Sequence, residues 1–195
     1  MKKTLVLLTF LSSSVFLCAQ EAGEYRGSLD LGVSVPGGGI GALSNLEINY
    51  NLSDNMRAGL RIGSGLFVRD LERDSDNDFE SGDFSSNLSF SGTYDYCFNS
   101  GGALVPYVGA GLGVFIAAGY AGRDGEDYSF SVLEWSPNFG GFLRAGFEVG
   151  KFRVGAEYNF IPDVPLIDAE GVQVGDMSNS YLGFTVGFFV GGGTW

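Results

Sequence analysis

Carboxylates and arginines that alternate with apolar residues are the groups in this sequence best placed to do chemistry. A pair of carboxylates could serve as the acid and base of glycoside hydrolysis, and Glu148 and Glu157 are the candidates. Each has an arginine predicted to face it, Arg153 for Glu148 and Arg144 for Glu157. A general acid has to carry a proton, whereas an arginine neighbour keeps a carboxylate ionised. We therefore expect these residues to form ion pairs and not a catalytic site.

Other kinds of reactive site have little support in the sequence. The chain contains no histidine, which excludes Ser-His-Asp and Cys-His nucleophilic sites and removes the commonest metal ligand. Cys97 has no basic residue near it in sequence and is expected to be an unreactive thiol. Asp74, Asp76 and Asp78 are spaced like the first three ligands of a calcium loop, but the glycine and the final glutamate of that loop are missing. We expect neither an enzyme nor a resident metal or cofactor.

The residues that would position these charges lie in long segments of alternating apolar and polar or small residues. This period of two is typical of strands with one apolar face. It predicts eight strands, at residues 25–35, 42–52, 56–68, 84–98, 104–120, 139–149, 152–160 and 180–191. Most are about as long as the ~9–11 residues that cross a bilayer at a tilt. The connections at one end of the predicted barrel are tight turns, and most of those at the other end are long polar segments. Transmembrane barrels have this asymmetry.

Two of the tight turns, at residues 53–55 and 150–151, also predict which charged residues face one another. They place three oppositely charged pairs at facing positions on the inward side of the strands: Glu47 with Arg61, Arg144 with Glu157, and Glu148 with Arg153. Opposed charges in a sheet contribute about 0.2–1 kcal/mol per pair, and an unpaired buried charge costs several kcal/mol. We predict three ion pairs inside the barrel.

The N-terminal residues indicate export. Lys2 and Lys3 precede an apolar stretch that is too short to span a membrane comfortably and ends in small residues at Cys18 and Ala19, which is typical of a cleavable signal peptide. A retained anchor and acylation of Cys18 are the alternatives. The prediction is a signal peptide over residues 1–19 and one domain over residues 20–195. The fold class is all-β, an eight-stranded antiparallel transmembrane barrel with both termini periplasmic; the alternative is a soluble β-sandwich.

The charge balance restricts the partners. The chain has 23 acidic and 11 basic residues, a net charge of −12, and lacks the basic clusters that nucleic acid requires. The expected partners are outer-membrane lipid, lipopolysaccharide and the barrel-assembly machinery. The sequence does not identify an extracellular partner.

Three segments carry a family resemblance: the leader ending in Cys18-Ala19-Gln20, residues 106–113 (PYVGAGLG) and residues 183–189 (GFTVGFF). They resemble the small outer-membrane β-barrel family, the OmpX/OmpA-like and porin-family barrels of the Bacteroidota type. The family's aromatic C-terminus matches Trp195, although the glycines at 191–193 break the alternation before it. The resemblance implies the barrel alone. With the acidic connections and the predicted ion pairs, we expect a structural or surface-interaction barrel with acidic extracellular loops and an ion-paired interior. A narrow diffusion channel for water or small solutes is the alternative.

Overall fold

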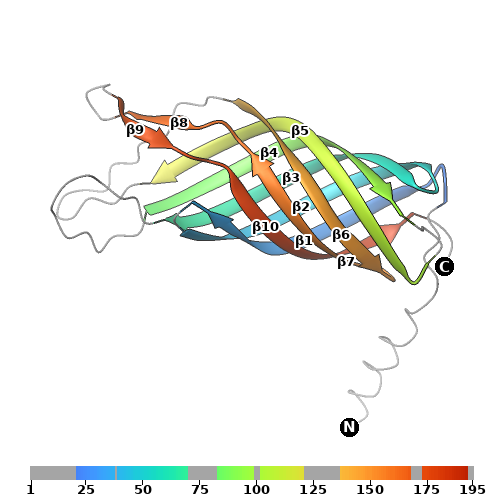
Figure 1. The fold of residues 1–195 in the computed structure, drawn as a ribbon. Helices are drawn as coiled ribbons and strands as arrows, with labels where there is room; N and C mark the ends of the chain where they lie inside the picture. Colours follow the sequence, from blue (N-terminus) through green and yellow to red (C-terminus); the bar gives the residue numbers. More distant parts are fainter. Residues whose placement is uncertain are drawn as a thin grey trace, which may run out of the picture.

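The described chain is built from strands. The computed structural model describes residues 21–37, 39–69, 83–98, 102–120, 137–167 and 173–192. The strands are β1 (Tyr25–Pro36), β2 (Gly39–Ser53), β3 (Met56–Arg69), β4 (Asp83–Cys97), β5 (Leu104–Tyr120), β6 (Asn138–Val149), β7 (Phe152–Phe160), β8 (Val164–Ile167), β9 (Gln173–Met177) and β10 (Tyr181–Gly191). Eight of them close an antiparallel barrel in the order β1-β10-β7-β6-β5-β4-β3-β2 (Figure 1).

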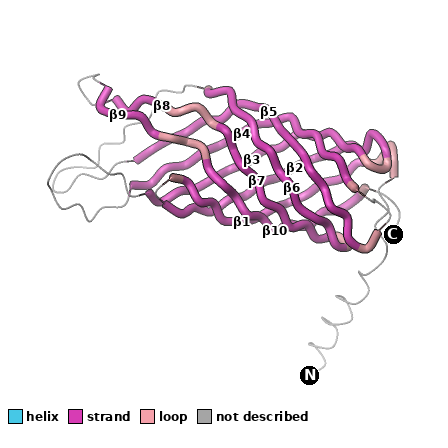
Figure 2. Tube along the Cα trace, in the orientation of Figure 1, coloured by secondary structure: helices cyan, strands magenta, loops and turns pink. Residues whose placement is uncertain are grey.

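Alternation of apolar residues located all eight barrel strands to within three residues, but it missed one hairpin. The connection expected at residues 161–179 contains β8 and β9, which pair only with each other and extend beyond one end of the barrel (Figure 2). With four and five residues, these strands are too short for a period of two to stand out. The predicted signal peptide, Cys18, Trp195 and the aspartates 74, 76 and 78 lie outside the described residues.

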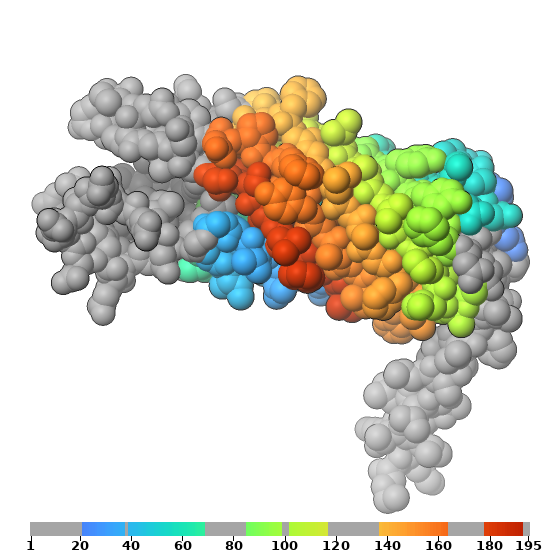
Figure 3. Space-filling model, in the orientation of Figure 1, coloured from blue at the N-terminus to red at the C-terminus, as the bar shows by residue number. Residues whose placement is uncertain are grey.

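The outer face of the barrel is apolar and the inner face is polar. Strand β10 alternates strictly between buried and exposed positions along most of its length, and its exposed residues are Leu182, Phe184, Val186, Phe188 and Val190. Leu112 and Phe139 expose 78% and 80% of their surface. Figure 3 shows one side of the barrel's outer surface, to which strands from several parts of the chain contribute. No helix in the described residues is long and apolar enough to span a membrane.

The turns at one end of the barrel set the register. Ser53 Oγ accepts hydrogen bonds from the backbone N–H groups of Asn55 and Met56, at 3.3 and 3.1 Å, and so closes the turn between β2 and β3. Gly150, in the turn between β6 and β7, has a φ of 59°, a left-handed conformation that glycine adopts without strain. Because a slip of one residue would move every side chain to the other face, these turns decide which residues point inward.

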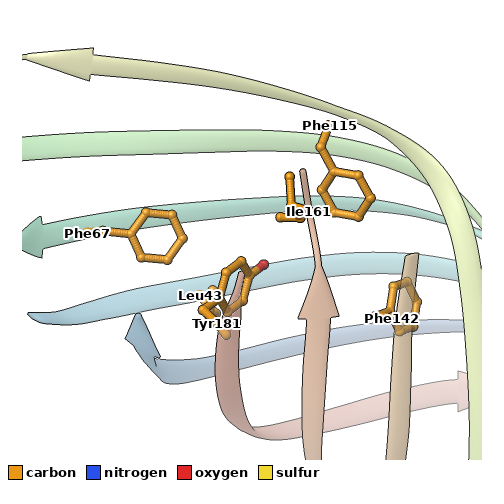
Figure 4. Close-up of a cluster of buried hydrophobic side chains, with 6 residues drawn as sticks. All are labelled: Leu43, Phe67, Phe115, Phe142, Ile161 and Tyr181. Atoms are coloured by element: carbon orange, nitrogen blue, oxygen red, sulfur yellow. The ribbon is translucent and has the colours of Figure 1, made fainter. Parts of the chain in front are cut away.

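Apolar side chains fill the barrel interior at the end where the long connections leave. This cluster consists of Leu43, Phe67, Phe115, Phe142, Ile161 and Tyr181, which converge from the surrounding strands (Figure 4). The rings of Phe67 and Tyr181 are 5.1 Å apart.

The opposite end, where the turns lie, has its own contacts. Cys97, Val105 and Tyr107 form a second, smaller cluster there. Asn51 is fully buried and donates hydrogen bonds to the carbonyl oxygens of Glu21 and Gly192, at 3.1 and 3.0 Å. These contacts hold the residues before β1 against the end of β10. The charged interior therefore lies between two packed ends.

Candidate functional site: the charged interior of the barrel

Among the side chains that the structure describes, ten charged ones point into the barrel between the packed ends. We call them the interior charge network: Arg26, Arg57, Arg61, Arg144, Arg153, Asp30, Glu47, Asp95, Glu148 and Glu157. All ten are buried, with at most 6% of their surface exposed. Five arginines face five carboxylates, so the formal charge of the network is zero. This balance fits the high cost of leaving a buried charge unpaired.

Eight members form one continuous chain in which positive and negative groups alternate. Its salt bridges run from Arg26 to Glu148 (2.5 Å), Glu148 to Arg57 (2.9 Å), Arg57 to Asp95 (2.7 Å), Asp95 to Arg144 (2.8 Å), Arg144 to Glu47 (2.7 Å), Glu47 to Arg153 (3.3 Å) and Arg153 to Asp30. Arg61 and Glu157 form a separate pair at 2.6 Å. Each carboxylate thus has at least one arginine partner.

Arg144 is at the centre of this chain. Its Nη1 and Nη2 donate to the two carboxylate oxygens of Glu47, at 2.8 and 2.7 Å. Its Nε and Nη2 also donate to the oxygens of Asp95, each at 2.8 Å. Forked contacts of this kind are the strongest that arginine makes with carboxylates. Because Glu47 is on β2 and Arg144 is on β6, the contact joins opposite walls of the barrel.

The six residues singled out in the sequence all lie in the network, and their backbone positions match the predicted register. Glu47 is opposite Arg61, Arg144 opposite Glu157, and Glu148 opposite Arg153. The salt bridges, however, join other partners: Glu47 with Arg144 and Arg153, Arg61 with Glu157, and Glu148 with Arg26 and Arg57. A long arginine side chain in a narrow eight-stranded barrel can reach past its neighbouring strand, so these three facing pairs are not the bonded ones. Arg57 and Asp95, which also face each other, are bonded.

Glycines allow charges two strands apart to meet. Asp95 on β4 and Arg144 on β6 both pair with Gly109 on β5, which lies between them. Asp30 on β1 and Arg153 on β7 are likewise separated by Gly187 on β10. A Cβ atom built on either glycine would overlap the nearby aspartate. The absence of a side chain is therefore what lets each aspartate and arginine bond across the middle strand.

This geometry predicts a cost for adding one methyl group. Gly187→Ala should destabilise the barrel by about 1–3 kcal/mol, because the new Cβ overlaps both Asp30 and the Leu29 carbonyl oxygen. Gly92→Ala is the matched control, since its Cβ would have no heavy atom closer than 4.0 Å. Urea unfolding of the two variants in detergent measures the difference. Equal stability of the two variants would contradict the role assigned to Gly187.

Four members of the network were not assigned to an ion pair from the sequence. Two of them, Arg57 and Asp95, have partners on strands whose register no tight turn defines. Arg26 and Asp30 were missed altogether. The sequence pattern could have identified Asp30, because the apolar Leu31 and Val33 alternate along β1 on the outward side and the residues between and beside them face inward.

Aromatic rings border the network at both ends. The guanidinium of Arg61 lies 3.8 Å from the ring centroid of Phe142 in the apolar cluster, and that of Arg26 lies 3.3 Å from the ring of Phe189. Cation–π contacts of this kind are stabilising when shielded from water. Among the described residues, no group of three or more histidine, cysteine, aspartate or glutamate side chains is arranged to hold a metal ion.

Comparison with known proteins shows the fold. No protein-family model matches the sequence, and no curated protein matches it. Among solved structures, the chain is similar to Neisserial surface protein A (NspA), with 16% identity over 87% of this chain and 97% of that chain and a TM-score of 0.52. It is also similar to the outer membrane enzyme PagL, with 16% identity over 85% of this chain and 98% of that chain and a TM-score of 0.50.

Proposed function

We propose that this protein is an outer-membrane barrel of structural or surface-interaction type, which holds acidic loops outside the cell on a closed scaffold. The observation that carries the proposal is the contrast between its two faces. The outer face is a continuous belt of exposed apolar residues, and the inner face holds five arginines bridged to five carboxylates. Apolar residues outside and polar residues inside are the arrangement expected of a barrel in lipid.

The proposed orientation places both termini and the short turns in the periplasm. The connections at residues 70–82, 121–137 and 161–180 together contain 14 acidic and two basic residues, and they leave from the other end of the barrel. In this proposal they face the outside, residues 1–19 are the signal peptide, and residues 20–195 are the mature barrel. Lipid, lipopolysaccharide and the barrel-assembly machinery remain the proposed partners.

The interior favours a scaffold over an enzyme or a channel. Of the two similar structures, one is called an enzyme and the other a surface protein, so the shared fold does not decide between these roles. Here every interior carboxylate is bonded to an arginine, which leaves no carboxylate available as a proton donor. The same salt bridges, with an apolar cluster at one end, occupy the path that a solute would take.

The closed interior predicts a protein that does not conduct. In a planar bilayer with 1 M KCl, the inserted barrel should show no steady unit conductance, because its eight-stranded interior is filled by side chains. Arg144→Ala combined with Glu47→Ala removes the central bridge between opposite walls and serves as a comparison variant. Brief, irregular openings of this variant alone would fit the proposal.

Stable unit conductance of the unchanged protein would contradict the closed scaffold. The alternative function, a narrow diffusion channel for water or small solutes, would then be the better explanation. Insertion itself has to be verified by flotation with vesicles, so that the absence of current is not confused with the absence of protein.

A further inference from the structure

A small cavity lies inside the barrel, among the members of the interior charge network. Its volume is about 10 Å³, which is about the smallest volume that can hold one water molecule. Its charged lining residues are Asp30, Arg144 and Arg153 from the continuous chain of salt bridges, and Glu157 from the separate pair with Arg61. The two parts of the network therefore meet at this cavity, although no salt bridge among the described residues joins them.

One buried donor beside this cavity lacks an acceptor. Arg153 donates through Nε and Nη2 to the two carboxylate oxygens of Asp30, and Nη2 also contacts Glu47 at 3.3 Å. Its Nη1 is buried and has no hydrogen-bond partner among the described residues. All three nitrogens of a guanidinium are donors, and a buried donor without an acceptor costs free energy. The cavity, which Arg153 lines, is the space beside this side chain where an acceptor could lie.

Gly155 leaves room in the cavity for a small molecule. Arg153, Gly155 and Glu157 are buried on the inward face of β7, so the glycine lies between the arginine and the carboxylate. A Cβ atom built on Gly155 would be 2.5 Å from the hydroxyl oxygen of Tyr107 and 3.6 Å from Thr185 Oγ1. Both of these residues also line the cavity. Two hydroxyl groups therefore approach the place that a side chain would otherwise fill.

We propose that this cavity is the binding site of one ordered water molecule. The water accepts a hydrogen bond from Arg153 Nη1 and donates to the Glu157 carboxylate and to one of the two hydroxyl oxygens. Glu157 can accept this bond, because a carboxylate has about four lone-pair sites and Arg61 and Asn159 occupy three of them. The water joins Glu157 to Arg153, so that all ten charged residues form one bonded network.

The lining of the cavity selects water over an ion. Two arginines and two carboxylates line it, so their formal charges cancel and neither an anion nor a cation is favoured. The other polar groups include hydroxyls, which can both donate and accept hydrogen bonds. A buried water needs about two to four polar partners, and this site offers a guanidinium donor, a carboxylate acceptor and two hydroxyls. A neutral ligand of this size that both donates and accepts is a water molecule.

Crystal structures of the detergent-solubilised protein test the site. In the unchanged protein we expect a water within hydrogen-bonding distance of both Arg153 Nη1 and the Glu157 carboxylate. Gly155→Ala places a methyl group in the cavity, so the refined occupancy of this water should fall at least about fivefold. Gly92→Ala is the matched control and should leave the occupancy unchanged. Gly92 does not line the cavity, and a Cβ atom built on it would have no heavy atom closer than 4.0 Å.

The structure of the unchanged protein can overturn the inference by itself, whether or not Gly155→Ala folds. It would do so if Arg153 Nη1 bonded another protein group directly and side chains closed the cavity. A water that kept its full occupancy in Gly155→Ala would also overturn it. Soaking the crystals in bromide tests for an anion, and we expect no anomalous peak in the cavity. A bromide peak there would show that the site binds a halide and not water.

Discussion

Arg144→Ala should lower the free energy of unfolding by about 3–5 kcal/mol, the cost of removing one partner from a buried ion pair. Arg144 makes forked contacts with Glu47 and further hydrogen bonds with Asp95, and all three side chains are buried. Its loss leaves excess negative charge at a buried position. Denaturant unfolding of the barrel in detergent or vesicles measures the change.

A second substitution identifies the partner. Adding Glu47→Gln to Arg144→Ala should recover part of the lost stability, because it removes one of the two carboxylates that lose Arg144 and keep a single arginine partner each, Arg153 for Glu47 and Arg57 for Asp95. Adding Glu157→Gln should not, since Glu157 is bonded to Arg61 and Asn159. The strand register alone predicts that Glu157→Gln would recover stability and Glu47→Gln would not, because Glu157 is the residue opposite Arg144. Recovery with Glu157→Gln and none with Glu47→Gln would mean that the facing residues are the true ion pairs.

Leu112→Arg should destabilise the inserted barrel by about 2–4 kcal/mol. Leu112 lies near the middle of β5 and exposes 78% of its surface, so in a bilayer its side chain would face the hydrocarbon core. An arginine there would carry its charge into lipid. Refolding into vesicles and unfolding by denaturant give the difference from the unchanged protein.

Leu104→Arg is the matched control for this prediction. Leu104 begins the same strand, faces outward with 51% of its surface exposed, and lies at the turn end. A charge near the interface costs only about 0–1 kcal/mol, so the two variants should differ clearly. If the outer face met water, both substitutions would be nearly neutral, as exposed positions usually are. Equal effects would therefore contradict the membrane location.

The sequence by itself determined the eight strands and the direction in which their side chains point. Alternation is a local property, and a strand keeps its period of two whatever its neighbours are. The two tight turns also determined which residues of two neighbouring strands lie opposite one another, because a short turn allows only a few pairing registers. That is why the positions of Glu47, Arg61, Arg144, Glu157, Glu148 and Arg153 could be predicted.

The partners of those charges were decided only by the closed barrel. A salt bridge between Arg144 and Glu47 joins residues 97 positions apart on opposite walls, and no turn relates those walls. Closure brings together side chains that are separated in sequence and in strand order, and the glycines at 109 and 187 open the space for two of the contacts. An arginine side chain then bonds the carboxylates nearest in three dimensions. Its choice of partner depends on barrel diameter and strand order, which local alternation does not specify.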